Sequence, residues 1–181
     1  MFIYHFKRKN MVGDKLVPLN AQKGSMPDVY REHIKKYNGR EKLLEKRIPI
    51  LDCLWNDVLH LSPINPQLIL DVYHKHDLVP EVRKGEVFEV YKIPVSKLTD
   101  GKTVCFQSFN YDFNNYSPDL DKYSNFSLND YNELTEVPDK QIEVWHNDKK
   151  AGRVLFWYSH IMHILTKDEI DVSDCEVIRC S

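Results

Sequence analysis

The chain lacks the features that would place it in a membrane or outside the cell. No stretch of its 181 residues approaches the roughly 20 consecutive apolar residues that a membrane helix requires. Residues 1–9 run from apolar to basic, which is the reverse of a secretory signal. We therefore expect a cytoplasmic protein that does not associate with a membrane.

Cysteine is scarce and its spacing is uninformative. The four cysteines form no C-x-x-C pair, which excludes zinc-ribbon and thioredoxin-type motifs, and we expect free thiols. Internal repeats and Pro/Ser-rich linkers are also absent, so we predict a single globular domain over residues 1–181. A chain of this length buries about two-thirds of the surface that its unfolded form exposes, so packing alone can stabilise it.

The net charge of −2 hides an asymmetry between the two parts of the chain. Residues 1–50 carry 12 Lys+Arg against 5 Asp+Glu, a net of +7, whereas residues 51–181 carry 13 against 22, a net of −9. Such polarity suggests a polyanionic partner, such as a nucleic acid, for the basic N-terminal third. The alternative is that these cations are solvated and pair with acidic residues from later in the chain.

Strand-like and helix-like patterns alternate along the chain. Alternating apolar residues predict strands, and amphipathic stretches that begin at proline predict helices. The expected strands are residues 2–6, 58–62, 87–95, 103–109, 153–158 and 176–179; the expected helices are residues 27–37, a stretch beginning at Asn65-Pro66, and residues 138–147. This order indicates an α+β fold with one mixed or antiparallel sheet flanked by a few helices.

Four local features complete the expected layout. Residues 13–24 show no clear period and are expected to form an extended loop, after which Ser25 is a plausible N-cap for the first helix. Residues 48–55 are the most apolar stretch and fit either a buried helix or a strand. Thr99-Asp100-Gly101 has hairpin chemistry, which predicts that the strands on either side of it pair with each other.

The segment 110–129 combines aromatic and amide side chains. A loop of this length inside a compact domain is usually functional or mobile, and aromatics beside amides suit stacking and hydrogen bonding to a protein or small ligand. The alternative is a surface excursion whose aromatics cover an edge of the core. The aromatic residues are Tyr111, Phe113, Tyr116, Tyr123 and Phe126.

Eight histidines are more than a domain of this size needs. His160 and His163 would share one face of a helix, and that spacing is compatible with metal ligation. A single pair with no carboxylate in register is a weak signal, so we predict no metal site.

One constellation of polar residues lies beside the apolar strands. Tyr4 and His5 lie on the first strand, His60 and Ser62 on a central strand, and Arg153 at the start of a late strand. Histidine can hydrogen-bond ribose hydroxyls, serine or tyrosine can contact a nicotinamide, and arginine can pair with a pyrophosphate. Each of these residues taken alone is more often structural.

The order of three motifs resembles that of the ADP-ribosyltransferase superfamily, and within it the DarT-type and RNA 2′-phosphotransferase-like proteins. The motifs are Ile3-Tyr4-His5-Phe6, Val58-Leu59-His60-Leu61-Ser62-Pro63 and Arg153-Val154-Leu155-Phe156. The whole chain also resembles small bacterial proteins that share its segments 18–20, 54–60 and 170–173, a likeness that brings no activity with it. The superfamily resemblance implies an ADP-ribosyltransferase-like fold and NAD as the nucleotide.

The resemblance also implies roles for individual residues. His5 would correspond to the residue that contacts the NAD ribose and Ser62 to the residue near the nicotinamide, with both in the catalytic set. Tyr4, His60 and Arg153 would complete the nucleotide-binding set. The third motif of the superfamily supplies a glutamate, whereas the matching strand here begins with Arg153.

Three functions follow as alternatives. The first is an NAD-dependent ADP-ribosyltransferase-like enzyme that acts on a nucleic-acid or protein acceptor. The second is a non-catalytic binding module that uses segment 110–129 to engage a protein or small ligand. The third is binding of single-stranded nucleic acid by the basic third, with Tyr4, Tyr30 and Tyr37 as stacking platforms.

Overall fold

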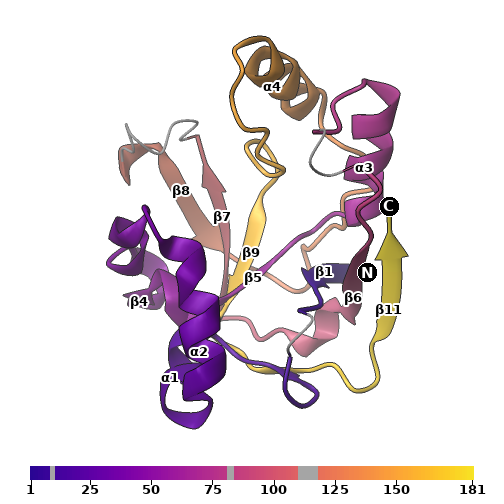
Figure 1. Ribbon diagram of the computed structural model, residues 1–181. Coiled ribbons are helices and arrows are strands. Elements are labelled where there is room, and N and C mark those ends of the chain that lie inside the picture. Colours follow the sequence, from indigo (N-terminus) through magenta and orange to yellow (C-terminus); the bar gives the residue numbers. More distant parts are fainter. Residues whose placement is uncertain (9–10, 81–83, 110–117) are drawn as a thin grey trace.

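The computed structural model describes residues 1–8, 11–80, 84–109 and 118–181, and it shows an α+β architecture with several antiparallel sheets (Figure 1). The main elements of the described residues are four helices and two sheets. The helices are α1 (Leu19–Ser25), α2 (Pro27–Ile34), α3 (Pro66–Lys75) and α4 (Asp139–Lys150). None of the helices in the described part is long and apolar enough to span a bilayer.

The first main sheet has three strands in the order β1-β6-β11, and both pairings are antiparallel. The second has four strands in the order β5-β9-β7-β8, also antiparallel throughout. The strands of the first sheet are β1 (Phe2–Phe6), β6 (Phe88–Pro94) and β11 (Glu176–Cys180). Those of the second are β5 (Leu59–Leu61), β7 (Thr103–Ser108), β8 (Asp121–Asn125) and β9 (His163–Thr166).

Two short ribbons and several 3₁₀ turns complete the described elements. The ribbons pair β2 (Lys15–Leu16) with β10 (Ile170–Asp171), and β3 (Arg47–Ile48) with β4 (Cys53–Leu54). The 3₁₀ turns are Lys35–Tyr37, Glu41–Leu44, Pro49–Leu51, Trp55–Asp57, Val95–Lys97 and Pro118–Leu120. The apolar stretch 48–55 is therefore neither one helix nor one strand, because the short ribbon and its turns fold it back on itself.

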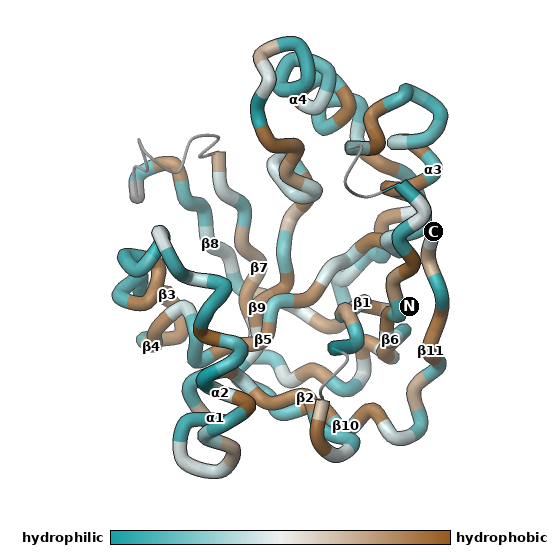
Figure 2. The backbone as a smooth tube through the Cα atoms, in the orientation of Figure 1, coloured by the Kyte–Doolittle hydropathy of each residue, from teal (hydrophilic) through white to brown (hydrophobic). Residues whose placement is uncertain are grey.

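A backbone bridge joins the two main sheets. The amides of Tyr4 and Ser62 each donate to the other residue's carbonyl at 2.8 Å, which links β1 to the end of β5. The largest core cluster includes Ile3 and Ile93 from the first sheet and Leu61 and Ile164 from the second, all almost fully buried. Burial of this shared apolar surface fixes the two sheets against each other. Figure 2 shows α2 and α4 as mostly hydrophilic tubes outside the more hydrophobic strands.

The hairpin expected at Thr99-Asp100-Gly101 is wrong, because the strands before and after it belong to different sheets. Side chains tie this connection to distant segments. Asp168 accepts a hydrogen bond from the amide of Thr99 at 2.9 Å, and Asp100 accepts one from the amide of Leu128, also at 2.9 Å. The expected single sheet is therefore two main sheets, with this turn as the crossing point between them.

The strand expected at residues 153–158 is also wrong, since this described segment has no regular structure. Its polar groups bond to α4 instead of to a neighbouring strand. The indole Nε1 of Trp145 donates to the carbonyl of Phe156 at 2.7 Å, and the amide of Arg153 donates to the carbonyl of Asp148 at 2.8 Å. The strand that this part of the chain contributes to the four-stranded sheet is β9, which begins five residues after Tyr158.

Smaller boundaries differ as well. The expected loop at 13–24 contains β2 and α1, and the N-cap of α2 is Met26, since Ser25 ends α1 and its hydroxyl donates to the carbonyl of Ala21. The expected cap of α3 is confirmed, because Asn65 Oδ1 accepts from the amide of Gln67 at 3.0 Å.

Candidate functional site

A cavity of about 390 Å³ lies between the α2 region and the strands of both main sheets. That size falls within the range of small-molecule sites, about 300–1,000 Å³. Its residues come from the first 60 residues of the chain, from β7 and from residues 156–163. They are His5, Arg8, Val17, Leu19, Lys36, Tyr37, Arg40, Leu43, Lys46, Trp55, Asn56, Val58, Leu59, His60, Phe106, Ser108, Phe156, Trp157, Tyr158, Ser159 and His163.

Three histidines from three strands line this cavity. His5 lies on β1, His60 on β5 and His163 at the start of β9. Nε2 of His60 donates to the carbonyl of Trp55 at 3.1 Å, and its ring centroid lies 4.3 Å from that of the indole. Nδ1 of His5 is buried beside the amide of Phe6 and makes no well-formed hydrogen bond within the described residues.

Burial keeps these imidazoles neutral at pH 7. It lowers the pKa of His5 to about 4, with a further contribution from the nearby charge of Arg8. It lowers the pKa of His60 to about 3, helped by His163, and that of His163 to about 4, helped by Lys46. Neutral imidazoles can both donate and accept hydrogen bonds, as recognition of sugar hydroxyls requires.

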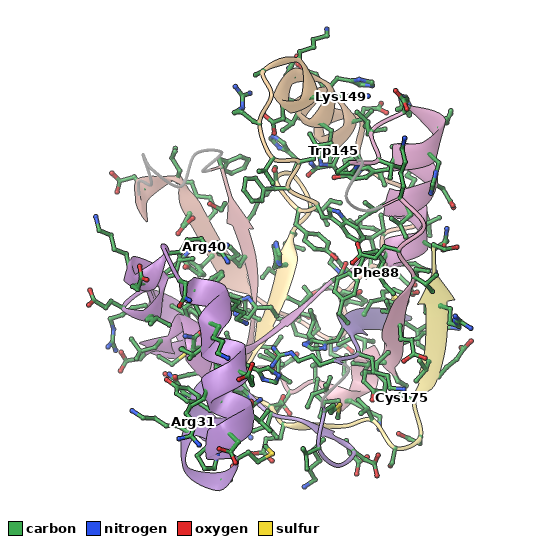
Figure 3. The ribbon with its side chains drawn as sticks, in the orientation of Figure 1. Arg31, Arg40, Phe88, Trp145, Lys149 and Cys175 are labelled. Carbon is green, nitrogen blue, oxygen red and sulfur yellow. The ribbon has the colours of Figure 1, made fainter. Side chains whose placement is uncertain are left out.

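Cationic side chains gather at one part of the wall. Arg8, Lys36 and Arg40 all line the cavity, and Arg40 comes from the α2 side of the molecule (Figure 3). Lys36 reaches solvent, yet surrounding protein atoms lower its pKa to about 8, with added effects of Arg8 and Arg40. Nη1 of Arg8 donates to Nδ1 of His33 on α2 at 2.5 Å, which holds the guanidinium in place.

A fourth cation is part of the aromatic wall. Nζ of Lys46 lies 4.1 Å from the ring centroid of Trp55 and 4.4 Å from that of Phe106. It forms a 2.7 Å ion pair with Asp121 on β8, in which both side chains are nearly fully buried. This pair ties the segment before β3 to the four-stranded sheet and shapes one end of the cavity.

No Asp or Glu belongs to the lining that the described residues form. A cavity with three nearby cations and no carboxylate favours an anionic ligand, because like charges repel until a counter-charge binds. The tryptophan and phenylalanine side chains of the lining suit stacking with an aromatic base. The arrangement therefore fits a ligand that joins phosphate groups to a planar ring, held by hydrogen bonds from uncharged histidines.

Only two of the five residues selected from the sequence, His5 and His60, lie in the cavity wall. The expectation that Tyr4, Ser62 and Arg153 join them is wrong. The hydroxyl of Tyr4 donates to Glu133 Oε1 at 2.5 Å, and the hydroxyl of Ser62 donates to the carbonyl of Ile64 at 2.8 Å, both in the core.

Arg153 makes its contacts at the end of α4. Its Nε and Nη2 lie 2.8 Å and 2.6 Å from Asp148 Oδ1, a nearly buried carboxylate. The resemblance placed Arg153 on a strand of the cleft, whereas it follows a helix and neutralises that helix's buried aspartate.

Several lining residues were not selected from the sequence. Arg8, Lys36, Arg40 and Lys46 belong to the basic third, so the charge asymmetry was the signal that pointed to them. The sequence suggests His163 only as half of a metal pair on a helix, and this placement is wrong because His163 begins β9. Within the described residues no cluster of three or more His, Cys, Asp or Glu side chains is arranged for a metal.

Other cations of the basic third form surface pairs. Arg31 pairs with Asp28, Lys35 with Glu32 at 2.6 Å, Arg47 with Asp52 at 2.5 Å, and Lys7 with Glu89 at 3.3 Å. Two of the expected stacking platforms are unsuitable, because Tyr4 is buried and Tyr37 is buried with its hydroxyl donating to Asn56.

Part of segment 110–129 can be assessed. Tyr111, Phe113 and Tyr116 lie outside the described residues. Tyr123 on β8 packs against Phe106 with ring centroids 5.0 Å apart, and Phe126 belongs to the main core cluster. These two aromatics therefore contribute to the fold, in line with the alternative that the segment covers a core edge.

No family model, curated protein or solved structure matches this chain.

Proposed function

We propose that the cavity binds a phosphate-bearing nucleotide, with NAD as the substrate, and that the protein transfers its ADP-ribosyl group to an acceptor. The observation that carries this proposal is the convergence of Arg8, Lys36 and Arg40 on one cavity whose described lining has no carboxylate. Arginine and lysine are the side chains that bind phosphate oxygens in proteins. The motif resemblance adds NAD as the particular nucleotide.

The residues present suit the parts of such a ligand. Arg8, Lys36 and Arg40 would bind the pyrophosphate, and the neutral imidazoles of His5 and His60 would bond ribose hydroxyls. The walls around Trp55 would stack with a base. The fit is incomplete at one point, because the described lining offers no carboxylate of the kind the superfamily uses.

In the transfer, the bond between ribose C1′ and the nicotinamide nitrogen breaks, and its electron pair leaves with nicotinamide. The acceptor's nucleophile forms the new bond to C1′ and loses one proton. The chain's own part is to hold the phosphates and ribose in the cavity and to take up that proton on a neutral imidazole. His5 and His163 are the candidates, since neither ring is protonated at pH 7.

Calorimetry with NAD and ADP-ribose tests binding, and release of nicotinamide tests the reaction. We expect Arg8→Gln and Lys36→Gln each to weaken binding at least about tenfold, because each removes a charged hydrogen bond of about 1.5–3 kcal/mol. Arg31→Gln is the matched control, since Arg31 points outward from α2 and pairs with Asp28 (Figure 3). Failure of the wild-type protein to bind either nucleotide would remove the proposal.

A further inference from the structure

A second hollow adjoins the cavity and has a different character. This groove, of about 720 Å³, contains the apolar side chains of Phe6, Val87, Phe88, Val154 and Trp157. Val154 is 70% exposed and Val87 46% exposed, so both present apolar surface to solvent. The rings of Phe6, Phe88 and Trp157, which line the groove, pack edge to face with centroids 5.6–5.8 Å apart.

A thin wall separates this groove from the cavity. Phe156, Trp157 and Tyr158 line both spaces, and this segment has no regular secondary structure. The chain at the end of β1 also divides them, because His5 and Arg8 line the cavity whereas Phe6 and Lys7 line the groove. A molecule lying in the groove is therefore next to whatever the cavity holds.

The charges of the two spaces differ. The groove carries Lys7 and Arg179 together with Glu86 and Glu89, and Lys7 pairs with Glu89 at 3.3 Å. A nucleic-acid strand presents one negative charge at every phosphate, and a groove whose two cations are balanced by two carboxylates offers it no net attraction. A polypeptide can present apolar side chains to the exposed valines and charges of either sign to the rim.

We propose that this groove binds the acceptor, and that the acceptor is an extended segment of polypeptide and not a nucleic acid. An apolar side chain of that segment covers Val87 and Val154, and a neighbouring nucleophilic side chain reaches past residues 156–158 to the cavity. The transfer step rests on the proposed function: the acceptor nucleophile bonds to ribose C1′, nicotinamide leaves with the electron pair, and the nucleophile's proton passes to an imidazole. Occupation of the groove does not depend on that step.

Binding of a labelled unfolded protein tests the groove without NAD. We expect fluorescein-labelled β-casein to bind the full chain, and Val154→Asp and Val87→Asp each to weaken that binding about tenfold, as expected for lost apolar contacts. Val12→Asp is the matched control, because Val12 is 62% exposed but lies outside the groove. No binding of β-casein, or equal losses in all three variants, would overturn the proposal.

A second experiment follows the label from adenine-labelled NAD into β-casein and into poly(dT). We expect label in β-casein alone, a loss of about tenfold in Val154→Asp, and unchanged nicotinamide release in the absence of acceptor. Label in poly(dT) instead would contradict the proposal of a polypeptide acceptor but would support the proposed transferase activity. Binding of β-casein at the groove without nicotinamide release would contradict the proposed transferase activity but would support the proposal that the groove binds polypeptide.

Discussion

At the scale of single residues, His33 controls the position of Arg8. It lies on α2, outside the cavity lining, and its Nδ1 accepts the hydrogen bond from Arg8. We expect His33→Ala to weaken nucleotide binding about three- to tenfold, the effect of one lost hydrogen bond of 0.5–1.5 kcal/mol. His33→Asn retains an acceptor and should recover part of the affinity in the same calorimetric assay. An unchanged dissociation constant in His33→Ala would show that Arg8 needs no such support.

The ammonium group of Lys36 gives the cavity a pH dependence. The surrounding protein atoms, together with Arg8 and Arg40, lower its pKa to about 8, so it loses its charge as the pH rises through 8, well before an ordinary lysine does. We expect the affinity for ADP-ribose to fall between pH 7 and pH 9.5. In Lys36→Arg the cation stays charged over that range, and the fall should largely disappear. The same fall in both proteins would assign the effect to another group.

At the scale of elements, the N-cap of α3 is the feature that the sequence predicts most directly. Asn65 precedes Pro66 and accepts from the amide of Gln67, as the preferences for both positions predict. We expect Asn65→Ala to lower the free energy of unfolding by about 1 kcal/mol in urea denaturation. Asn147→Ala, at an exposed position of α4, is the control and should change it by less than about 0.5 kcal/mol. Equal effects would mean that the cap contributes nothing specific.

Local signals predicted elements well and pairings poorly. Strand β1 was predicted with its full extent, since Phe2 to Phe6 alternate along five residues whose backbone bonds to β6. The turn at Thr99-Asp100-Gly101 suits a hairpin locally, but side chains of Asp168 and Asp100 fix it as a link between two sheets. Residues 153–158 are apolar enough for a strand, yet the indole of Trp145 donates a hydrogen bond to the carbonyl of Phe156, which a neighbouring strand would otherwise use. These strand pairings depend on hydrogen-bond partners that are distant in sequence, and a local sequence pattern carries no information about such partners.

The same limit applies to the site. The charge asymmetry indicates the basic third, and positions on apolar strands where a side chain can enter a cleft indicate His5 and His60. Ser62 follows β5 only two residues after His60, but its hydroxyl bonds to the carbonyl of Ile64 and stays in the core. Which strand polar groups face the cavity depends on how the two sheets pack, and this is decided by the joint core around Ile3 and Ile164.

At the scale of the whole molecule, the cavity makes stability sensitive to acid. The unfolded chain protonates histidine near pH 6.5, whereas folded His5 and His163 resist protonation down to about pH 4 and His60 to about pH 3. Because the unfolded state binds more protons in that window, the free energy of unfolding falls as pH falls below 6.5. Each histidine adds at most about 1.4 kcal/mol per pH unit to this slope.

Urea denaturation between pH 7 and pH 4.5 measures that slope. We expect His163→Gln to reduce the slope of the free energy of unfolding against pH. Glutamine does not titrate, so one of the three histidines that bind a proton only in the unfolded state is removed, whatever the substitution does to stability at pH 7. His74→Gln is the control, because His74 is exposed on α3. A bound nucleotide stabilises the folded state further by occupying the same cavity, so the transition should shift to lower pH when ADP-ribose is present. An equal slope in His163→Gln and wild type would mean that carboxylates elsewhere cause the loss of stability in acid. Burial would then lower the pKa of the three histidines less than their positions imply.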